Sequence, residues 1–209
     1  MEHYFAADAA PLDPAELTTR HVRLAGFEVD VVTAPGVFSA HRVDLGTSVL
    51  LRTVAGEAGG LPPTGTLVDL GCGWGPLAIT MALTCPDAQV WGIDINPRAL
   101  ELTRLNAGRL NLANLQATVP NDVPEGWMQH PAGAIDVIWS NPPIRVGKEA
   151  LHELLTTWLA RLTATGHADL VVQKNLGSDS LQSWLTDQGY PTERLASAKG
   201  YRVLRATKA

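Results

Sequence analysis

Two short loops hold the residues of this sequence that could do chemistry. The first is the glycine-rich run Asp69-Leu70-Gly71-Cys72-Gly73-Trp74-Gly75, and the second is Asn141-Pro142-Pro143-Ile144. Each follows a short apolar run, which is typical of a turn that leaves the carboxyl end of a buried strand. Ligands of open α/β sheets bind at that edge of the sheet. We therefore expect the two loops to lie together and to form one ligand site.

The spacing of the glycine-rich loop indicates a nucleotide-like ligand but not a dinucleotide. Glycine lets a ligand approach the backbone where a Cβ would collide with it. A dinucleotide-binding loop has a further glycine at position 76, where this chain has Pro76. Pro76 suits the first turn of a helix, because its missing N–H has no helical partner there. On this motif alone, a tight strand-to-helix turn without a ligand remains the alternative.

The Asn-Pro-Pro loop could orient a weakly nucleophilic amine. Its two prolines fix the backbone and remove two N–H donors, so the loop is rigid. The exocyclic amine of guanine or adenine, or a side-chain amide, has its lone pair delocalised into a π-system. The Asn141 side-chain oxygen and the Pro142 carbonyl could accept the two N–H hydrogens and turn the lone pair toward an electrophilic group. The alternative is an ordinary proline turn.

Composition bounds the class of protein. The chain has 209 residues, and no linker or low-complexity tract divides it, so we expect one domain. No apolar run approaches the ~20 residues of a membrane span, and the N-terminus lacks the profile of a signal peptide, so we expect a cytoplasmic protein. Cys72 and Cys85 have no metal-like partners around them. We expect both to be small buried residues and no metal to be bound.

A net charge of −5 limits how the chain could hold RNA, because affinity for a phosphate backbone grows with the number of phosphates that are neutralised. Any RNA contact must therefore be local. The candidate cations flank the Asn-Pro-Pro loop or lie near the C-terminus: Arg145, Lys148, Lys199, Arg202, Arg205 and Lys208. The alternative for each is a solvated surface charge.

The elements that must position the loops follow from periodicity. From residue 66 strands alternate with helices, which predicts βαβ units on a parallel sheet. The expected strands are 66–68, 88–93, 114–119, 134–140 and 168–173. The expected helices are 44–54, with Asp44 as its cap, then 76–83, 97–106, 147–162 and 179–186. Residues 22–24 and 27–32 predict a hairpin outside the main sheet, and residues 193–197 and 201–205 predict a second hairpin.

Four further residues need an interpretation. Asp94 ends the second strand at the place where an acid accepts both hydroxyls of a ribose, although it could instead cap the next helix. Asn96 is expected to start that helix. On spacing alone, Phe38 is expected in the core. His152 has no carboxylate or nucleophile placed to work with it, so we expect a half-exposed structural histidine.

With these motifs laid out, the chain resembles the small methyltransferase domain family of class I S-adenosylmethionine-dependent methyltransferases, and within it the ribosomal small-subunit RNA guanine-N2 methyltransferases and their single-domain relatives. The resemblance spans nearly the whole chain. The segments that carry it are His3-Tyr4-Phe5, 35–39, 44–47, 69–73, 94–96, 141–148 and 200–204.

The resemblance implies a Rossmann-like α/β fold: a seven-stranded, mostly parallel sheet with helices on both faces, the last strand inserted antiparallel, and an N-terminal hairpin extension. Residues 1–209 would form a single methyltransferase domain. Within it, residues 1–60 would be the hairpin and helix extension packed on the catalytic core of residues 61–209.

The resemblance also implies the site. The cofactor would be S-adenosylmethionine, which leaves as S-adenosylhomocysteine. The glycine-rich loop would hold its methionine half, Asp94 its ribose, and Asp122 its adenine, while Phe38 and Thr47 would close the pocket. The full set of implied cofactor residues is Phe38, Thr47, Asp69, Gly71, Cys72, Gly73, Gly75, Asp94, Ile95, Asn96, Asp122 and Asn141.

Asn141 and Pro142 would be the catalytic residues that orient the guanine amine, and Pro143, Ile144 and Arg145 would contact the substrate. Many Asn-Pro-Pro enzymes have Tyr or Phe where this chain has Ile144, so the departure weakens the case for an adenine enzyme. The implied function is methylation of a guanine N2 in 16S ribosomal RNA or the small ribosomal subunit, by a monomer or homodimer. The alternatives are a protein glutamine-N5 or adenine-N6 methyltransferase, or a non-catalytic copy that positions RNA.

Overall fold

The computed structural model describes residues 12–54, 60–129, 133–143 and 147–208. Strands of the main sheet are β3 (Thr66–Leu70), β4 (Gln89–Ile93), β5 (Leu115–Thr118), β6 (Ile135–Ser140), β7 (Leu162–Gln173), β8 (Thr192–Ala198) and β9 (Tyr201–Thr207). Helices are α1 (Leu45–Val54), α2 (Pro76–Thr84), α3 (Pro97–Arg109), α4 (Gly126–Gln129), α5 (Lys148–Leu159) and α6 (Ser178–Asp187). Short 3₁₀ helices are η1 (Pro14–Glu16), η2 (Pro120–Asp122) and η4 (Lys174–Leu176).

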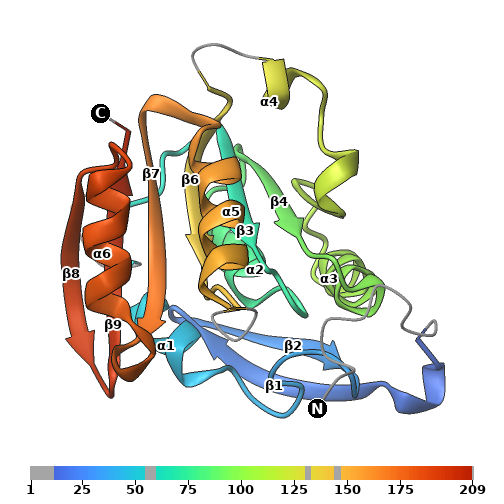
Figure 1. Cartoon of the computed structure of the whole chain (residues 1–209). Helices are drawn as coiled ribbons and strands as arrows, with labels where there is room; N and C mark the ends of the chain where they lie inside the picture. The colour runs from blue at the N-terminus through green and yellow to red at the C-terminus, as the bar shows by residue number, and fades with distance from the viewer. Residues whose placement is uncertain (1–11, 55–59, 130–132, 144–146, 209) are drawn as a thin grey trace.

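The sheet has seven strands in the order β5-β4-β3-β6-β7-β9-β8 (Figure 1). Strands β3 to β7 pair in parallel, whereas β9 runs antiparallel to both of its neighbours, β7 and β8. Strands β4 and β6 lie on opposite sides of β3, so the order reverses there, and such a reversal opens a crevice at the carboxyl ends of the strands. This architecture confirms the predicted class I fold with its inserted last strand.

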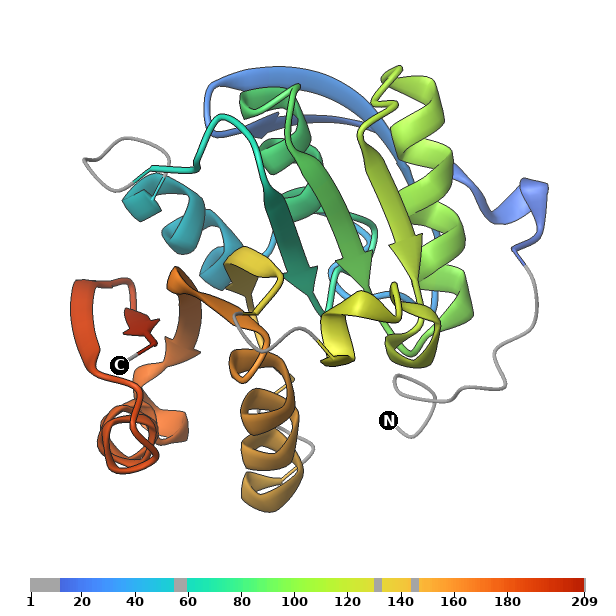
Figure 2. The same cartoon turned by 90° about the horizontal axis from the view of Figure 1, so that it is seen from above.

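Helices cover both faces of the sheet. Helices α1, α2 and α3 lie on one face, and α5 and α6 lie on the other (Figure 2). Successive side chains of a buried strand point to opposite faces of the sheet. Leu67 therefore packs in the apolar layer with α1, α2 and α3, and Val68 packs in the layer with α5 and α6. Both layers are clusters of buried apolar side chains, so the strand ends are held firmly at the edge where the two loops emerge.

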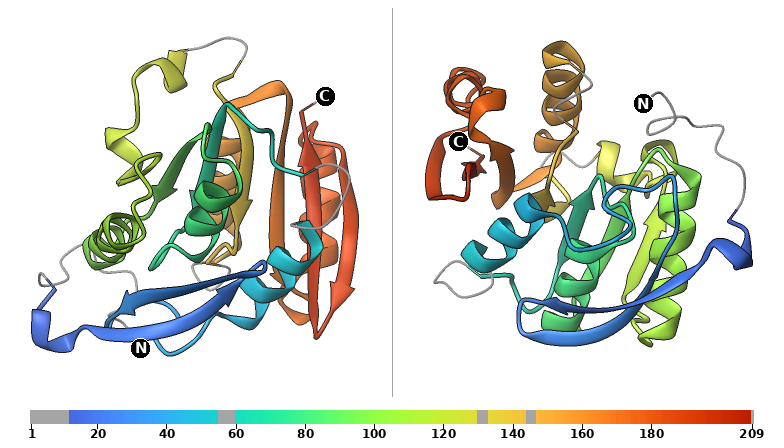
Figure 3. Two further views of the ribbon diagram at one scale, coloured as in Figure 1. Left: turned by 180° about the vertical axis from the view of Figure 1, so that it is seen from behind. Right: turned by 90° about the horizontal axis from the view of Figure 1, so that it is seen from below.

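The N-terminal hairpin forms its own antiparallel sheet of β1 (Thr18–Leu24) and β2 (Phe27–Thr33), outside the main sheet as expected. It crosses near the carboxyl ends of the strands, against α3 (Figure 3). The fully buried side chain of Asn106 on α3 makes the connection. Its Oδ1 accepts the N–H of Val32 (2.7 Å), and its Nδ2 donates to the carbonyls of Val32 (3.0 Å) and Trp74 (3.0 Å).

The boundary between α5 and β7 was predicted wrongly, and β7 begins at Leu162 instead of at residue 168. Helix α5 ends at Leu159, and Leu162, which was predicted to be its last residue, instead opens β7 opposite Ile135. The apolar spacing fits both states, because Leu162 is buried in either one. The backbone decides between them: the N–H groups of Ala134 and Ile135 both donate to the Arg161 carbonyl, which draws the chain out of the helix.

No helix among the described residues is long and apolar enough to cross a membrane.

Removal of the Asn106 amide should be costly. Asn106→Ala leaves three buried backbone groups without partners, and each such group typically costs about 1–3 kcal/mol. We expect the free energy of unfolding to fall by about 3 kcal/mol or more in urea titrations. Asn175→Ala, at an exposed asparagine, is the control and should change it by less than about 0.5 kcal/mol. Equal stability of the two variants would contradict the role of Asn106.

Candidate functional site

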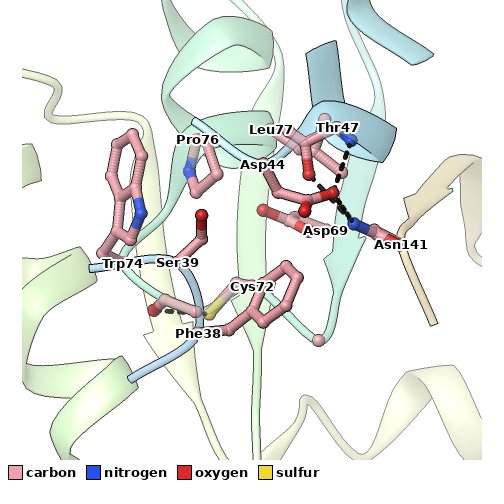
Figure 4. A pocket seen from close by; sticks show the side chains of 12 residues that line it. Phe38, Ser39, Asp44, Thr47, Asp69, Cys72, Trp74, Pro76, Leu77 and Asn141 are labelled. Atoms are coloured by element: carbon pink, nitrogen blue, oxygen red, sulfur yellow. Dashed lines mark hydrogen bonds between the residues drawn. The ribbon is translucent and has the colours of Figure 1, made fainter. Parts of the chain in front are cut away.

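The two loops meet at the carboxyl edge of the sheet, as the sequence predicts. Strands β3 and β6 are neighbours, and the register pairs Leu70 with Ser140, so the glycine-rich loop and the Asn-Pro-Pro loop leave the sheet side by side. A pocket lies between them and the start of α1 (Figure 4). It is lined by Phe38, Ser39, Asp44, Thr47, Asp69, Gly71, Cys72, Gly73, Trp74, Pro76, Leu77 and Asn141.

The glycine-rich loop presents bare backbone to this pocket. Gly71, Gly73 and Gly75 all have positive φ, in the left-handed region that favours glycine. A Cβ built on Gly71 would meet no protein atom within 4 Å, whereas one on Gly75 would lie 3.1 Å from the Thr103 hydroxyl. The third glycine therefore serves packing against α3, and the first leaves open space that a ligand can occupy.

Asp69 is a buried carboxylate with one oxygen unused. Its Oδ2 accepts the N–H of Ala78 in α2 (2.9 Å), while none of the described residues donates to its Oδ1. Burial raises the pKa of Asp69 to about 8; the Ala78 N–H opposes this rise, and the nearby charge of Asp94 adds to it. A buried acceptor without a partner points to a ligand donor. A cationic ammonium group in the pocket would match it.

Asp94 holds the glycine-rich loop in place. Its Oδ2 accepts the N–H of Gly73 (2.9 Å) and its Oδ1 accepts the N–H of Asn96 (2.9 Å). Burial raises the pKa of the Asp94 carboxyl, although these N–H groups oppose the rise. The cap of α3 is Asn96, whose Oδ1 accepts the N–H of Arg98 (3.0 Å). Asp94 therefore does not serve as that cap, and its oxygens keep lone pairs that could accept ribose hydroxyls.

Asn141 has a fixed amide. Its Nδ2 donates to Asp44 Oδ2 (2.9 Å) and to the Thr47 hydroxyl (3.2 Å), both at the start of α1 (Figure 4). No described residue donates to its Oδ1, so this oxygen is the acceptor that the side chain can offer. Pro142 follows and is buried, and Pro143 is half-buried. Ile144 and Arg145 lie outside the described residues.

Other predicted site residues lie near the loops without lining the pocket. Ile95 follows Asp94 and is 49% exposed, and Asn96 is buried and also donates to the Gly36 carbonyl. Asp122 is exposed in η2, after β5. None of these three residues lines the pocket described above, and neither do Gly75 and Asp94 of the predicted cofactor set. Their contacts with a cofactor stay predictions.

The expectation from spacing that Phe38 lies in the core was wrong. It is 44% exposed and lines the pocket instead of joining the core. The reason is the turn around it: Ser39 has φ of 54°, and its hydroxyl donates to the Arg42 carbonyl, so the segment runs as a loop over the pocket.

The predicted RNA-contacting cations differ in how far they are available to a ligand. Arg202 is buried and pairs with Asp179, and Arg205 pairs with the fully buried Asp169, so neither is available as a surface contact, and this part of the prediction was wrong. Lys208 donates to the Leu162 carbonyl (2.7 Å). Lys148 and Lys199 are exposed, and Arg145 lies outside the described residues.

The two cysteines and His152, to which the sequence analysis gave no catalytic role, are structural residues. Cys72 and Cys85 are free and buried, as predicted. Burial raises the pKa of the Cys72 thiol well above its usual value, which keeps it protonated. His152 is half-buried and stacks on Trp184 with ring centroids 3.7 Å apart, which confirms a structural histidine. No group of three metal-ligating side chains occurs in the part of the chain that the structure describes.

Five residues that line the pocket are absent from the predicted site residues: Ser39, Asp44, Trp74, Pro76 and Leu77. Asp44 was predicted only as a helix cap, and it does cap α1 by accepting the N–H groups of Gly46 and Thr47. Its contact with Asn141 spans 97 positions of the chain, and no local pattern records it.

A doubly wound sheet of this order, with a glycine-rich loop after β3 and an Asn-Pro-Pro loop after its neighbour β6, defines a class I methyltransferase. Residues 28–205 match the family described as the methyltransferase small domain. The chain therefore belongs to this family, and it is an S-adenosylmethionine-dependent methyltransferase.

Two relatives show how far the similarity extends. The uncharacterized protein YbxB of Bacillus subtilis is 29% identical over 99% of this chain and 98% of its own length. Ribosomal RNA small subunit methyltransferase C of Pseudomonas entomophila is 31% identical over 97% of this chain. The chain spans only 58% of the length of that second protein.

Solved structures agree on the fold. The chain is similar to the T. thermophilus 16S rRNA N2 methyltransferase RsmC in complex with AdoMet and guanosine, with a TM-score of 0.76, 25% identity, and coverage of 94% of this chain and 52% of that one. A TehB-like SAM-dependent methyltransferase from Corynebacterium glutamicum has a TM-score of 0.58 at 17% identity, with coverage of 82% and 91%, and shows the fold alone.

The titration of Asp69 should be visible in the stability of the ligand-free protein. The folded pKa of Asp69, about 8, lies above its ordinary value of 3.8, so at intermediate pH the unfolded chain releases this proton while the folded protein keeps it. The free energy of unfolding is therefore highest at low pH and falls as the pH rises from 3.8 to about 8. Asp69→Asn cannot ionise. We expect the wild type to lose on the order of 3 kcal/mol relative to this variant between pH 5 and pH 8.5, in urea titrations. The same stability difference at both pH values would show that Asp69 does not titrate in this range.

Proposed function

We propose that the protein transfers a methyl group from S-adenosylmethionine to the exocyclic N2 amine of a guanine in structured RNA, with 16S ribosomal RNA of the small subunit as its substrate. One observation carries the proposal: the Asn141 amide is held through its nitrogen, so that its oxygen is left as an acceptor beside the glycine-rich loop. The RNA substrate is supported by the similarity to ribosomal RNA methyltransferases along most of this chain.

The residues of the pocket fit the cofactor. The Asp69 oxygen without a partner could accept a hydrogen bond from the ammonium group of the cofactor's methionine half. The open space at Gly71 would let the methionine carboxylate lie close to the backbone of the loop. Asp94 can accept the ribose hydroxyls with its remaining lone pairs. Phe38, Thr47 and Cys72 line the same pocket and would enclose the ligand. Ile95, Asn96 and Asp122 lie outside this lining, and the resemblance to the family is what supports them as further contacts. When bound, S-adenosylmethionine supplies a methyl group on a positively charged sulfur.

Asn141 and Pro142 would orient the amine. The Asn141 oxygen and the Pro142 carbonyl accept its two N–H hydrogens, so that the nitrogen lone pair faces the methyl group. The methyl group would pass to this nitrogen, with the S–C bond breaking as the N–C bond forms and the donor leaving as a neutral thioether. The amine becomes cationic during transfer, and its extra proton leaves to water afterwards. No residue has to remove that proton in the transition state, which agrees with an amide at this position.

The target base has to reach this pocket. A guanine inside a duplex would be flipped or locally unpaired, and Pro143, Ile144 and Arg145 would contact it. The remaining exposed cations, such as Lys148 and Lys199, would meet nearby phosphates. With a net charge of −5, the protein would hold RNA through few such contacts, so a structured site is favoured over an extended strand.

A protein glutamine-N5 methyltransferase is the second candidate. A side-chain amide presents the same two N–H hydrogens to Asn141. The acidic chain, with Arg202 and Arg205 held in ion pairs, favours a less anionic substrate than RNA. The reach of the similarity to ribosomal RNA enzymes favours RNA. A non-catalytic copy is disfavoured, because both loops and the Asn141 contacts are intact.

Asn141→Ala should spare the fold and cofactor binding but slow the chemistry. The variant loses one preorganised acceptor, and comparable losses cost roughly a hundred- to a thousandfold in rate. The measurement is single-turnover methylation of small-subunit RNA or subunits, with S-adenosylhomocysteine affinity determined by calorimetry. Gln116→Ala, at an exposed amide on β5, is the control and should react like the wild type. Near-wild-type turnover by Asn141→Ala with cofactor bound would exclude the amine-orienting role.

A further inference from the structure

We propose that Asp44 is the positioning residue of the site: its carboxylate fixes the orientation of the Asn141 amide and thereby aims the accepting oxygen at the substrate amine. This inference rests on the proposed role of Asn141. It assigns Asp44 a second task beyond the capping of α1.

The hydrogen bonds allow one amide orientation only. An amide nitrogen has two N–H groups, and Asn141 Nδ2 has two acceptors: Asp44 Oδ2 at 2.9 Å and Thr47 Oγ1 at 3.2 Å. If the amide flipped, its oxygen would face the Asp44 carboxylate, and two acceptors would lie together without a proton between them. That arrangement is repulsive, and the part-buried location makes it more costly. The nitrogen is therefore kept at α1, and Oδ1 remains directed away from it.

Asp44 is itself held rigidly. The same Oδ2 accepts the N–H groups of Gly46 (2.7 Å) and Thr47 (3.2 Å), which fixes the carboxylate at the first turn of α1. A Cβ on Gly46 would lie 2.9 Å from this oxygen and 2.8 Å from the Tyr201 ring, so the backbone is packed directly against the carboxylate. Helix α1 in turn packs on β7 and β9. The main sheet thus fixes the position of α1, α1 fixes the Asp44 carboxylate, and this carboxylate fixes the Asn141 amide.

The charge of Asp44 also favours the chemistry. A carboxylate that accepts from Nδ2 polarises the amide and places more negative charge on its oxygen. The substrate nitrogen becomes positive as the methyl group transfers, so a more negative Oδ1 stabilises the transition state more than the bound substrate. Loss of Asp44 should therefore lower the rate of methyl transfer more than it weakens substrate binding.

Two variants separate the tasks of Asp44. In Asp44→Ser the side chain remains a good helix cap, but it is too short to reach Asn141. In Asp44→Asn the side-chain oxygen can still accept from Asn141 and from the helix N–H groups. We expect single-turnover methylation to fall by up to about a hundredfold in Asp44→Ser, with little change in substrate KM, and by only about threefold in Asp44→Asn. Equal losses in both variants, or a loss confined to KM, would overturn the proposal.

A double-mutant cycle tests whether Asp44 acts through Asn141. If it does, adding Asp44→Ser to Asn141→Ala should lower the rate by less than about twofold more, because the aimed oxygen is already gone. Cofactor affinity is measured for all variants, since Asp44 also lines the pocket. Rate losses that multiply in the double variant would show that Asp44 acts independently of Asn141.

A readout without substrate keeps this inference distinct from the proposed function. The side-chain amide protons of Asn141, assigned by their disappearance in Asn141→Ala, can be followed by NMR in the ligand-free protein. We expect signals of two hydrogen-bonded protons in the wild type and in Asp44→Asn, and loss of protection from solvent exchange in Asp44→Ser. Protection that survives in Asp44→Ser would overturn the positioning role, whichever substrate the protein methylates.

Discussion

The hydrogen bond between the Asn141 amide and the Asp44 carboxylate joins two parts of the chain that the sheet alone would not connect. Asn141 directly follows β6, and Asp44 directly precedes and caps α1, which packs on β7 and β9. The one side chain suited to orienting an amine therefore depends on a helix from the N-terminal segment. This segment builds part of the site, in addition to covering the core.

The cofactor side of the pocket depends on the same segment. Asn106 ties the hairpin to α3 and to the Trp74 carbonyl of the glycine-rich loop, and Asp94 and Thr103 hold the loop at Gly73. The backbone of the loop is thus satisfied by protein on its inner side. On the pocket side, Asp69 keeps one buried oxygen without a partner among the described residues. The site is preorganised except where a ligand would supply the missing donor.

Local physics made much of this structure predictable. The apolar runs before both loops, the Asn96 cap and the caps around α1 each follow from neighbouring residues, and they placed the two loops at one sheet edge. What could not be predicted depends on distant contacts. The spacing of Leu162 fits a helix or a strand, and its pairing with Ile135 decides for the strand. Arg202 and Arg205 have the sequence pattern of surface charges, but they form ion pairs with Asp179 and Asp169. Asp44 lies 97 positions from Asn141, so no local pattern indicates their hydrogen bond.

The central claim is the identity of the atom that receives the methyl group. Small ribosomal subunits from cells that lack this protein can be incubated with it and with S-adenosylmethionine labelled in the methyl group. The RNA is then digested to nucleosides and the proteins to peptides, and both are analysed by mass spectrometry. The account predicts label in N2-methylguanosine at one position of the 16S RNA. Label in N6-methyladenosine or in a glutamine side chain, or no label while the cofactor is bound, would contradict it.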